Sequence, residues 1–517
     1  RMPSTGKWYW ECLATTVASN GYLGVGLYYR TGSLTAAAIA TAQGRYVTAS
    51  GKRGGDPYGS YGGGFDDGDL IMVAVNMDEG TIFTGKNGSW FDSSNPLTNA
   101  SPMYDDLRTA YDDMDWYPSC NNWQDGNTAE FNFGQKPFAY APPKDFLPLC
   151  TQNMPVPGSV SPDKYFSANI WTGNETAGRI ITTGFNPDLI VGKARNDTGN
   201  WYWTDSVRGS NKFVYSNDMS EETTTANIIN IDDNTPDGFK LGSSGVINGT
   251  SAYNYVSYSW KAGGAKGTFN VDGADVGSAA NAGISGGTIT PSACSINTQE
   301  KFSILKYNGS GSAATLGHGL GKKPAFWLIR NLPNTGGSLD FPLYHDWLGP
   351  TKYMRFNSNA EAITKSSIWN DTAPTNSVLT IGSDSDCNID GEDYIAWVWC
   401  NVEGVQHFGA YQGNGSTTGP IVWTGFKPAM VIIKRTTSGS SNDYVLFDNK
   451  RDLVDPCHHR LLPDTNQAEN DTSSTSVNRI DFLSTGFKIW NSGDAWNNSG
   501  SDYIYMAWAA NPFASLY

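Results

Sequence analysis

The feature of this sequence that most restricts its fold is a pattern that occurs three times in the C-terminal two thirds of the chain. Each copy contains a Pro that precedes a short apolar run, and each copy ends on a Tyr and a Trp five residues apart. The three openings are Gly184-Phe185-Asn186-Pro187, Lys323-Pro324 and Gly425-Phe426-Lys427-Pro428, and the three endings are Tyr255…Trp260, Tyr394…Trp399 and Tyr503…Trp508. Ordered self-similarity of this kind indicates repeated structural units.

The repeats predict how the 517 residues are organised. We expect a first domain over 1–150, because Pro142-Pro143 and further prolines follow it and mark a boundary. Three repeats of about 100 residues then follow. Their expected ranges are 163–262, 301–404 and 405–517, with a Gly-, Ala- and Ser-rich connecting segment at 263–300.

The apolar segments of the chain are short and end in clusters of Gly, Asn or Asp. Ile71-Met72-Val73-Ala74-Val75 and Met430-Val431-Ile432-Ile433 are examples. Short runs bounded by turn residues are typical of β-strands, and apolar residues at helical spacing are nearly absent. The expected fold class is all-β, with a β-sandwich followed by three tandem sandwich-like repeats.

Charge and cysteine content exclude several classes of protein. The chain carries 35 Lys and Arg against 50 Asp and Glu, a net charge of −15, so it lacks the basic surface that binds nucleic acid phosphates. No apolar stretch approaches the length of a membrane-spanning helix, so we expect no membrane insertion. The 7 cysteines are dispersed without close pairing, which predicts free thiols rather than a disulfide framework.

The N-terminal motifs resemble those of the SPRY domain family. The motifs that carry the resemblance are Gly6-Lys7-Trp8-Tyr9-Trp10-Glu11, Gly24-Val25-Gly26, Gly80-Thr81-Ile82-Phe83, Lys86-Asn87-Gly88 and Phe131-Asn132-Phe133-Gly134. The resemblance implies a concanavalin-like β-sandwich that binds partners through its loops and has no catalytic residues. A Tyr- and Gly-rich insert at 57–64 and an acidic loop at 104–116 depart from the family pattern. Many different ligands bind to this fold, so the fold names none of them.

The C-terminal repeats resemble a repeat found in tail-fibre and other virion proteins of bacteriophages. The phrases that carry the resemblance are His318-Gly319-Leu320-Gly321, Tyr411-Gln412-Gly413-Asn414-Gly415 and Tyr505-Met506-Ala507-Trp508-Ala509. The match is good over 301–513 and looser over 163–262, where the His-Gly-Leu-Gly phrase is missing. The resemblance implies a virion protein and brings no enzymatic motif with it.

Aromatic residues in Gly- and Asn-rich stretches are the candidate ligand-binding residues. Exposed rings flanked by Asn and Asp suit carbohydrate, because the ring stacks on apolar C–H faces while amides and carboxylates take the hydroxyls. Rings folded back onto a sandwich are the alternative for each of them. The candidates are Tyr58, Tyr61, Trp90, Trp116, Trp123, Trp369 and Trp496.

Two acidic or histidine-rich clusters suggest metal sites but fit them poorly. In Cys457-His458-His459, neighbouring residues of a strand point to opposite faces and rarely ligate one ion together. The acidic stretch 384–393 resembles a calcium loop, but Ile389 stands where the loop needs Gly and Ile395 where it needs Glu, so a turn is the better interpretation. We nominate no metal site, no cofactor and no catalytic residue.

These observations lead to one expected function and two alternatives. The first is a non-enzymatic bacteriophage tail fibre or spike, located on the virion, that binds a host-surface ligand, most simply a glycan. Its expected partners are other virion proteins, a host glycan or protein, and copies of itself in a homo-oligomer, for which a trimer is one form. The alternatives are a head fibre or capsid decoration protein, and a glycan depolymerase, which would need two carboxylates facing a sugar.

Overall fold

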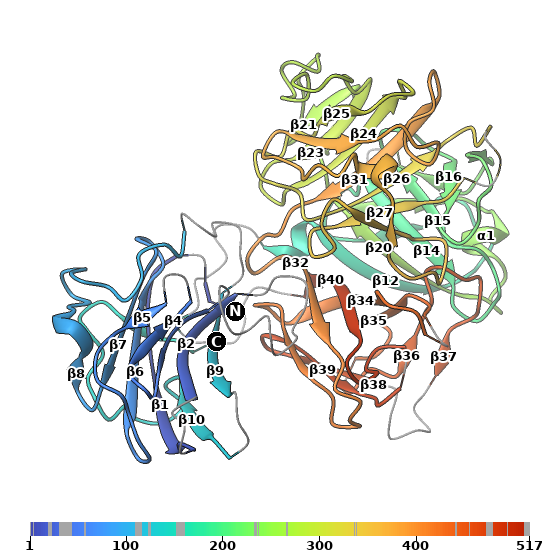
Figure 1. Cartoon of the computed structure of the whole chain (residues 1–517). Helices are drawn as coiled ribbons and strands as arrows, with labels where there is room; N and C mark the ends of the chain where they lie inside the picture. The colour runs from blue at the N-terminus through green and yellow to red at the C-terminus, as the bar shows by residue number, and fades with distance from the viewer. Residues whose placement is uncertain are drawn as a thin grey trace. The chain divides into compact units, whose positions relative to one another are not determined.

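The chain folds into two compact units, Arg1–Pro155 and Val156–Tyr517, called unit 1 and unit 2 here. Figure 1 shows the strands of unit 1 in blue to cyan and those of unit 2 in green to red. The computed structural model describes residues 2–3, 5–18, 23–29, 44–55, 58–108, 116–122, 126–150, 153, 161–231, 235, 237–264, 267–335, 337, 339–439, 442–453, 455–471, 479–493 and 495–510.

Unit 1 is built from two antiparallel sheets. One has the strand order β10-β1-β6-β7-β8, with β11 paired in parallel to β1, and the other has the order β5-β4-β3-β2-β9. The strands are β1 (Lys7–Thr16), β2 (Leu23–Tyr29), β3 (Gly44–Thr48), β4 (Lys52–Gly54), β5 (Gly59–Ser60), β6 (Leu70–Asn76), β7 (Thr81–Lys86), β8 (Ser89–Trp90), β9 (Trp116–Asn122), β10 (Thr128–Asn132) and β11 (Leu147–Pro148), and a 3-10 turn lies at Phe91–Ser93.

Alternation along β1 explains how unit 1 forms its core. Trp8, Trp10 and Cys12 join one apolar cluster, which also contains residues of the second sheet such as Val25 and Val47. Successive side chains of a strand point to opposite faces, so the residues between these three point to the other face of the sheet. Apolar positions of both sheets thus meet in one core, as in a sandwich.

Unit 2 contains the three repeats and the segment between the first two. Repeat 1 contains a 3-10 turn (Pro162–Lys164), β12 (Phe166–Thr172), β13 (Ile180–Thr182), β14 (Leu189–Ala194), β15 (Tyr202–Asp205), β16 (Lys212–Tyr215), β17 (Thr223–Thr224), β18 (Ile229–Asn230), β19 (Gly238–Leu241), α1 (Gly245–Asn248) and β20 (Asn254–Trp260). The segment 263–300 contains β21 (Phe269–Val271), β22 (Ala274–Asp275) and β23 (Ala293–Asn297).

The other two repeats have corresponding elements. Repeat 2 contains β24 (Phe302–Asn308), β25 (Ala314–Gly317), β26 (Phe326–Asn331), β27 (Pro342–His345), β28 (Lys352–Arg355), β29 (Ile363–Thr364), α2 (Ser366–Trp369), β30 (Val378–Ile381) and β31 (Asp393–Trp399). Repeat 3 contains β32 (Gln406–Gln412), β33 (Ile421–Trp423), β34 (Pro428–Arg435), β35 (Val445–Asp448), β36 (His459–Arg460), β37 (Asn470–Asp471), β38 (Arg479–Leu483), β39 (Gly486–Trp490) and β40 (Asp502–Ala509).

One strand order recurs in the main sheet of each repeat. The last strand of the repeat pairs antiparallel with the first strand on one side and with the strand after the Pro on the other. The three orders are β12-β20-β14-β15, β24-β31-β26-β27 and β32-β40-β34-β35. A smaller sheet accompanies each main sheet, namely β13-β19-β18, β25-β30 and β33-β39-β38, and we call these the outer sheets.

Both faces of each main sheet are buried, and each face has a different partner. In β40, Ile504, Met506 and Trp508 belong to the large cluster shared by the repeats, whereas Tyr503 and Tyr505 belong to the cluster that includes the outer sheet of repeat 3. Strands β20 and β31 divide their side chains in the same way. Burial on both faces explains why β31 and β40 are nearly continuous apolar runs, whereas β20 carries the buried Ser257 and Ser259 on the face that also bears Tyr255.

The three repeats share one core, at whose centre the closing tryptophans contact one another. The ring centroids of Trp260, Trp399 and Trp508 lie 6.1, 5.3 and 6.2 Å apart for the three pairs, each in an edge-to-face arrangement. Edge-to-face packing is a favoured geometry for aromatic pairs. The repeats are therefore packed around a common centre and do not form independent domains along a line.

Backbone hydrogen bonds at the junctions show that the repeats form a closed ring. The amide of Glu222 in repeat 1 donates to the carbonyl of Leu332 in repeat 2 at 2.7 Å. The equivalent bonds run from Ala362 to Thr436 at 3.0 Å, and from Glu469 back to Arg195 in repeat 1 at 2.6 Å. Each donor directly precedes β17, β29 or β37, and each acceptor is the first residue after β14, β26 or β34.

The segment 263–300 forms regular structure. Strand β23 pairs antiparallel with β24, and β21 pairs in parallel with β23, so the main sheet of repeat 2 gains three strands at this edge. The buried carboxylate of Asp188 fixes the start of the segment, because it accepts hydrogen bonds from the amides of Ala262 and Gly264 and from the hydroxyl of Ser295.

The prediction of an all-β sandwich architecture is confirmed. All seven cysteines are free thiols, as the dispersed spacing predicted. In the described part of the chain, no helix has the length and apolar character needed to cross a membrane.

Candidate ligand-binding site

Most of the aromatic residues nominated from the sequence are buried. The prediction of exposure is wrong for Tyr61, Trp116, Trp369 and Trp496, which are 5, 2, 0 and 1 % exposed. Trp90 is half-buried, Tyr58 is 59 % exposed, and Trp123 lies outside the described residues. A ring that is already covered on both faces offers no surface to a ligand.

Each buried candidate has a packing role that explains the outcome. Trp369 lies in the short helix α2, and its ring centroid is 5.2 Å from that of Trp327. The ring centroid of Trp496 lies 5.1 Å from that of Phe447. Trp116 begins strand β9 and donates its indole N–H to the Leu107 carbonyl at 3.0 Å.

Tyr61 has a packing role as well, since its ring meets that of Phe91 at 6.0 Å. A position in a Gly- and Asn-rich stretch therefore did not imply exposure in these four cases. Tyr58 keeps an exposed ring, with the Lys52 ammonium 5.4 Å from its centroid.

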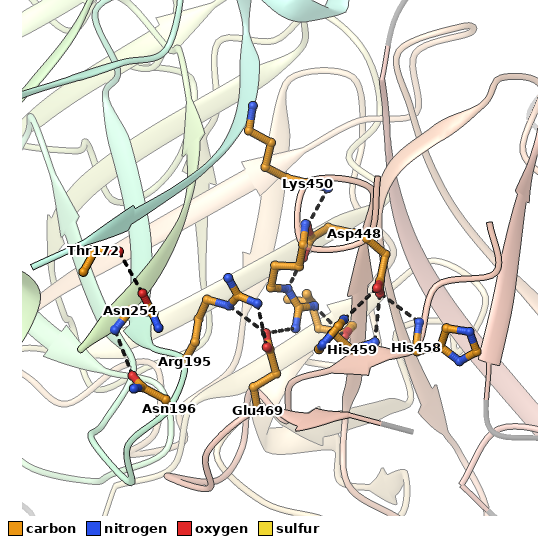
Figure 2. Close-up of polar contacts among 12 residues, drawn as sticks. Thr172, Arg195, Asn196, Asn254, Asp448, Lys450, His458, His459 and Glu469 are labelled. Atoms are coloured by element: carbon orange, nitrogen blue, oxygen red, sulfur yellow. Dashed lines mark hydrogen bonds and ion pairs between the residues drawn. The ribbon is translucent and has the colours of Figure 1, made fainter. Parts of the chain in front are cut away.

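The histidine pair 458–459 is held by an aspartate. Asp452 accepts the backbone amides of His458 and His459 at 2.8 Å each, and its other oxygen lies 2.6 Å from His459 Nδ1 (Figure 2). Within the described ranges, no group of three or more His, Cys, Asp or Glu residues could hold a metal ion.

The acidic stretch 384–393 is a turn whose carboxylates have partners within the chain. Asp384 accepts from Ser367 at 2.7 Å and pairs with Lys365 at 2.6 Å. Asp386 accepts the amide of Asp340 at 2.9 Å. The turn interpretation is confirmed, and these oxygens are engaged by side chains and amides of repeat 2.

A chain of ion pairs joins repeat 3 to repeat 1. Arg195 makes two hydrogen bonds to Glu469, at 2.9 and 2.7 Å, and Glu469 also pairs with Arg451 at 2.8 Å (Figure 2). Arg451 in turn pairs with the buried Asp448 at 2.5 Å, whose carboxylate accepts the Tyr258 hydroxyl at 2.7 Å. The Arg451 guanidinium lowers the pKa of Asp448 against the effect of its burial. Every charged group of this network has a partner, so it stabilises the ring closure and offers no reactive group.

The centre of unit 2 contains a small apolar cavity. Its volume is about 20 Å³, and its lining includes Trp260, Trp399 and Trp508. A space of this size could hold about one water molecule, but a water needs polar partners that an apolar wall does not provide. The shared core is therefore not a ligand site.

The outer sheet of repeat 3 carries an open pocket of about 350 Å³. We call it the Trp490 pocket, and it is lined by Asp455, Pro456, Arg479, Asp481, Leu483 and Trp490. Its volume lies within the range of small-molecule sites, roughly 300 to 1,000 Å³.

Strand alternation places the polar and aromatic side chains of the pocket on one face. In β38 and β39, Ile480, Phe482, Phe487 and Ile489 are buried in the core of repeat 3, so the residues between them face outward. The register pairs Arg479 with Trp490 and Asp481 with Lys488 across the hairpin. These four outward side chains are half-buried.

Trp490 is fixed by polar neighbours. Its indole N–H donates to Asp481 at 2.6 Å, which sets the orientation of the ring. The Lys488 ammonium lies 4.3 Å and the Arg479 guanidinium 5.4 Å from the ring centroid. The aromatic side chain is therefore held in place by charged groups beside an open pocket.

Repeat 1 has a pocket of about 450 Å³ on the equivalent hairpin, but it has no aromatic wall. Asn211, Asn227 and Asn230 contribute to its lining. Gly242 occupies the position equivalent to Trp490. The amide of Gly242 donates to the carbonyl of Ile228, and in the hairpin of repeat 3 the corresponding pair is Trp490 and Arg479. A Cβ on Gly242 would lie 1.7 Å from the Asn227 carbonyl oxygen, so the backbone leaves no room for a side chain there.

Repeat 2 presents a third version of this position. Its helix α2 takes the place of the outer strand, and the amide of Gly382 donates to Ile368 at 2.7 Å. A Cβ on Gly382 would lie 1.9 Å from the Ser367 carbonyl oxygen. Among the described residues, only repeat 3 places an aromatic ring here.

Sequence reasoning missed Trp490, Arg479, Asp481 and Lys488. The signal was present in the repeat itself, because Gly238-Phe239-Lys240-Leu241-Gly242 aligns with Gly486-Phe487-Lys488-Ile489-Trp490. A Trp at a position that is Gly in the other copy marks a side chain that the core does not require.

Comparisons with known proteins give a family for unit 2 and little for unit 1. A family model described as "Domain of unknown function (DUF7483)" matches residues 161–512. Among solved structures, the crystal structure of the SPRY domain of human HERC1 matches with 16 % identity, a TM-score of 0.18, and coverage of 26 % of this chain and 78 % of that chain. At that TM-score the similarity supports no further conclusion. A search of curated proteins finds no match. Because the family model covers more than half of the chain, the protein belongs to the family of the domain of unknown function DUF7483.

Proposed function

We propose that this protein is a non-enzymatic saccharide-binding protein of a bacteriophage particle, most simply a tail fibre or spike, and that the Trp490 pocket is its binding site. The observation that carries the binding proposal is the combination of one oriented, half-buried Trp with carboxylate and cationic side chains around an open pocket of about 350 Å³. Aromatic rings stack on the apolar faces of sugars, and the surrounding polar groups take the hydroxyls.

The association with a phage particle depends on the resemblance of the C-terminal repeats to those of virion proteins. The SPRY-like motifs of unit 1 support a second partner-binding module in the same chain. The expected partners remain other virion proteins and a host glycan or protein, in a particle where several copies of the chain act together.

Binding of the purified chain to a panel of saccharides tests the proposal. We expect at least one saccharide to bind, and Trp490→Ala to weaken that binding by roughly 10-fold, since truncating a central aromatic contact typically costs more than 1 kcal/mol. Trp423→Ala is the matched control, because Trp423 lies on β33 of the same outer sheet and does not line the pocket. Saccharide binding that is unchanged in Trp490→Ala would contradict the assignment of the site.

Two further measurements separate the alternatives. Incubation with host polysaccharide should leave the polymer length unchanged, and a reproducible shortening would favour a depolymerase in which Asp455 and Asp481 are the first carboxylates to replace. Imaging of intact particles should place the chain on the tail. A position on the capsid would favour the head-fibre or decoration protein.

A further inference from the structure

The charges of the Trp490 pocket are unevenly satisfied. Asp481 accepts the indole N–H of Trp490, and Asp455 accepts the amide of Phe482 at 2.9 Å and lies 3.6 Å from the Lys427 ammonium. Both carboxylates of the pocket therefore have partners within repeat 3.

The two cations beside Trp490 have no such partners in the described part of the chain. Neither Arg479 nor Lys488 forms an ion pair with a carboxylate there, although Asp481 stands opposite Lys488 in the hairpin register. The Arg479 Nε atom is buried and has no hydrogen-bond partner among the described residues.

From this imbalance we infer that the Trp490 pocket selects an anionic saccharide over a neutral one. The sugar ring would pack against Trp490 while its carboxylate or sulfate group accepts from Arg479 and Lys488. A planar guanidinium can hold either group through two parallel hydrogen bonds, and such charge-assisted bonds are about twice as strong as neutral ones. This inference rests on the proposed saccharide-binding function and adds its substrate class.

Repeat 1 shows why the selectivity should belong to repeat 3. At the place of Arg479 repeat 1 has Ile228, and at the place of Asp481 it has Asn230. Its pocket thus lacks both the guanidinium and the ring, and its polar side chains are three Asn amides and the Lys240 ammonium. Amides bind hydroxyls as well as they bind anions, and one ammonium without a guanidinium gives this pocket less reason to select an anionic saccharide.

The test compares three oligosaccharides of equal length: an oligoglucuronate, the neutral oligoglucose obtained when its carboxyl groups are reduced, and a sulfated oligoglucose. We expect the full chain to bind at least one anionic form roughly 10-fold more tightly than the neutral form. The carboxylated and sulfated forms distinguish the two possible sources of the negative charge. Because the groups are half-exposed, the preference should shrink as the salt concentration rises.

Substitutions assign the preference to the pocket. Arg479→Gln should remove the roughly 10-fold preference and leave binding of the neutral oligosaccharide within about 2-fold, whereas Arg479→Lys should retain part of the preference because the charge remains. Lys240→Gln is the matched control, since Lys240 is the equivalent of Lys488 in repeat 1. Thermal unfolding of each variant shows whether it is folded.

The possible failures are distinguishable. If neutral and anionic forms bind equally and Trp490→Ala weakens both, the anionic selectivity is wrong and the saccharide-binding function stands. If the preference survives in the folded Arg479→Gln variant, the assignment to this pocket is wrong. If the saccharide panel and all three oligosaccharides fail to bind, the proposed function itself is wrong.

Discussion

The three repeats are alike at the positions that face the shared core, and they differ at the equivalent positions of their outer sheets. At the centre, Trp260, Trp399 and Trp508 are the same residue in three copies and contact one another. On the outer sheets, the equivalent positions are Gly242, Gly382 and Trp490. Closing a ring around one core requires matching shapes at the centre, whereas each outer sheet, as far as the structure describes it, pairs strands of a single repeat. The comparison shows that the residues that pack the repeats together are the same in all three, whereas the residues of the outer sheets can differ from one repeat to the next.

The first way to test this comparison is to truncate one Trp at each place. Trp399→Ala should lower the free energy of unfolding by about 3 to 5 kcal/mol, because a fully buried Trp loses its burial and leaves a cavity. Trp490→Ala should lower it by about 1 kcal/mol, since this side chain is only half-buried. Chemical denaturation followed by tryptophan fluorescence measures both.

The number of transitions in the same unfolding curves tests whether the three repeats unfold together. A shared core should make unit 2 of Trp399→Ala unfold in one transition, including repeats 1 and 3, which carry no substitution. Separate transitions for the three repeats, with only one of them shifted, would show that the repeats are independent and that the inward positions are not coupled.

The second test concerns a buried residue of repeat 2 whose counterpart in repeat 1 is exposed. Glu300 is buried where repeat 1 has the exposed Lys164, and burial raises its pKa from 4.5 to about 8. The folded chain therefore holds the proton more tightly than the unfolded chain between these two values. The contribution of Glu300 to the free energy of unfolding is therefore highest below about pH 4.5 and falls as the pH rises to about 8.

Glu300→Gln should remove this pH dependence, because Gln resembles the protonated form at every pH. The free energy of unfolding of the variant should exceed that of the original chain at pH 8 by on the order of 3 kcal/mol, and the two should agree near pH 4.5. Comparing the two proteins cancels the contributions of other titrating groups. If the free energies of unfolding of the two proteins differed by the same amount at both pH values, the Glu300 carboxyl would already be solvated or paired in the folded chain.

The third and smallest test compares two junctions of the ring. Glu469 makes short contacts to Arg195 and Arg451, whereas the equivalent Glu222 lies 3.5 Å from Arg208 and 3.6 Å from Lys212. Glu469→Gln should cost about 1.5 kcal/mol of stability and Glu222→Gln about 0.5 kcal/mol. Equal losses, measured by denaturation at low and high salt, would contradict the idea that the junction that closes the ring depends most on its ion pairs.

The sequence predicted the β class and the strands that end each repeat, because both depend on local pattern. The Tyr and Trp of those strands are core residues. The shared core was not predicted, because a repeated pattern shows that units are alike without showing that they pack around one centre.

The candidate site was harder to predict than the fold. Trp369 and Trp496 stand in polar stretches, but the chain folds back and buries them against Trp327 and Phe447. Trp490 ends a regular strand and so resembled a core residue, although alternation directs it outward. Exposure depends on which face of a strand is covered, and that depends on residues distant in the sequence.

The closed ring also bears on how many Trp490 pockets one molecule contains. The surfaces that join one repeat to the next are all engaged within a single chain, as in a ring whose head-to-tail contacts close. A protein with three similar repeats could have presented three similar sites, but the differences at the outer hairpins leave one Trp490 pocket per molecule. Under the proposed function, the valency of attachment would therefore come from the number of chains that a particle displays.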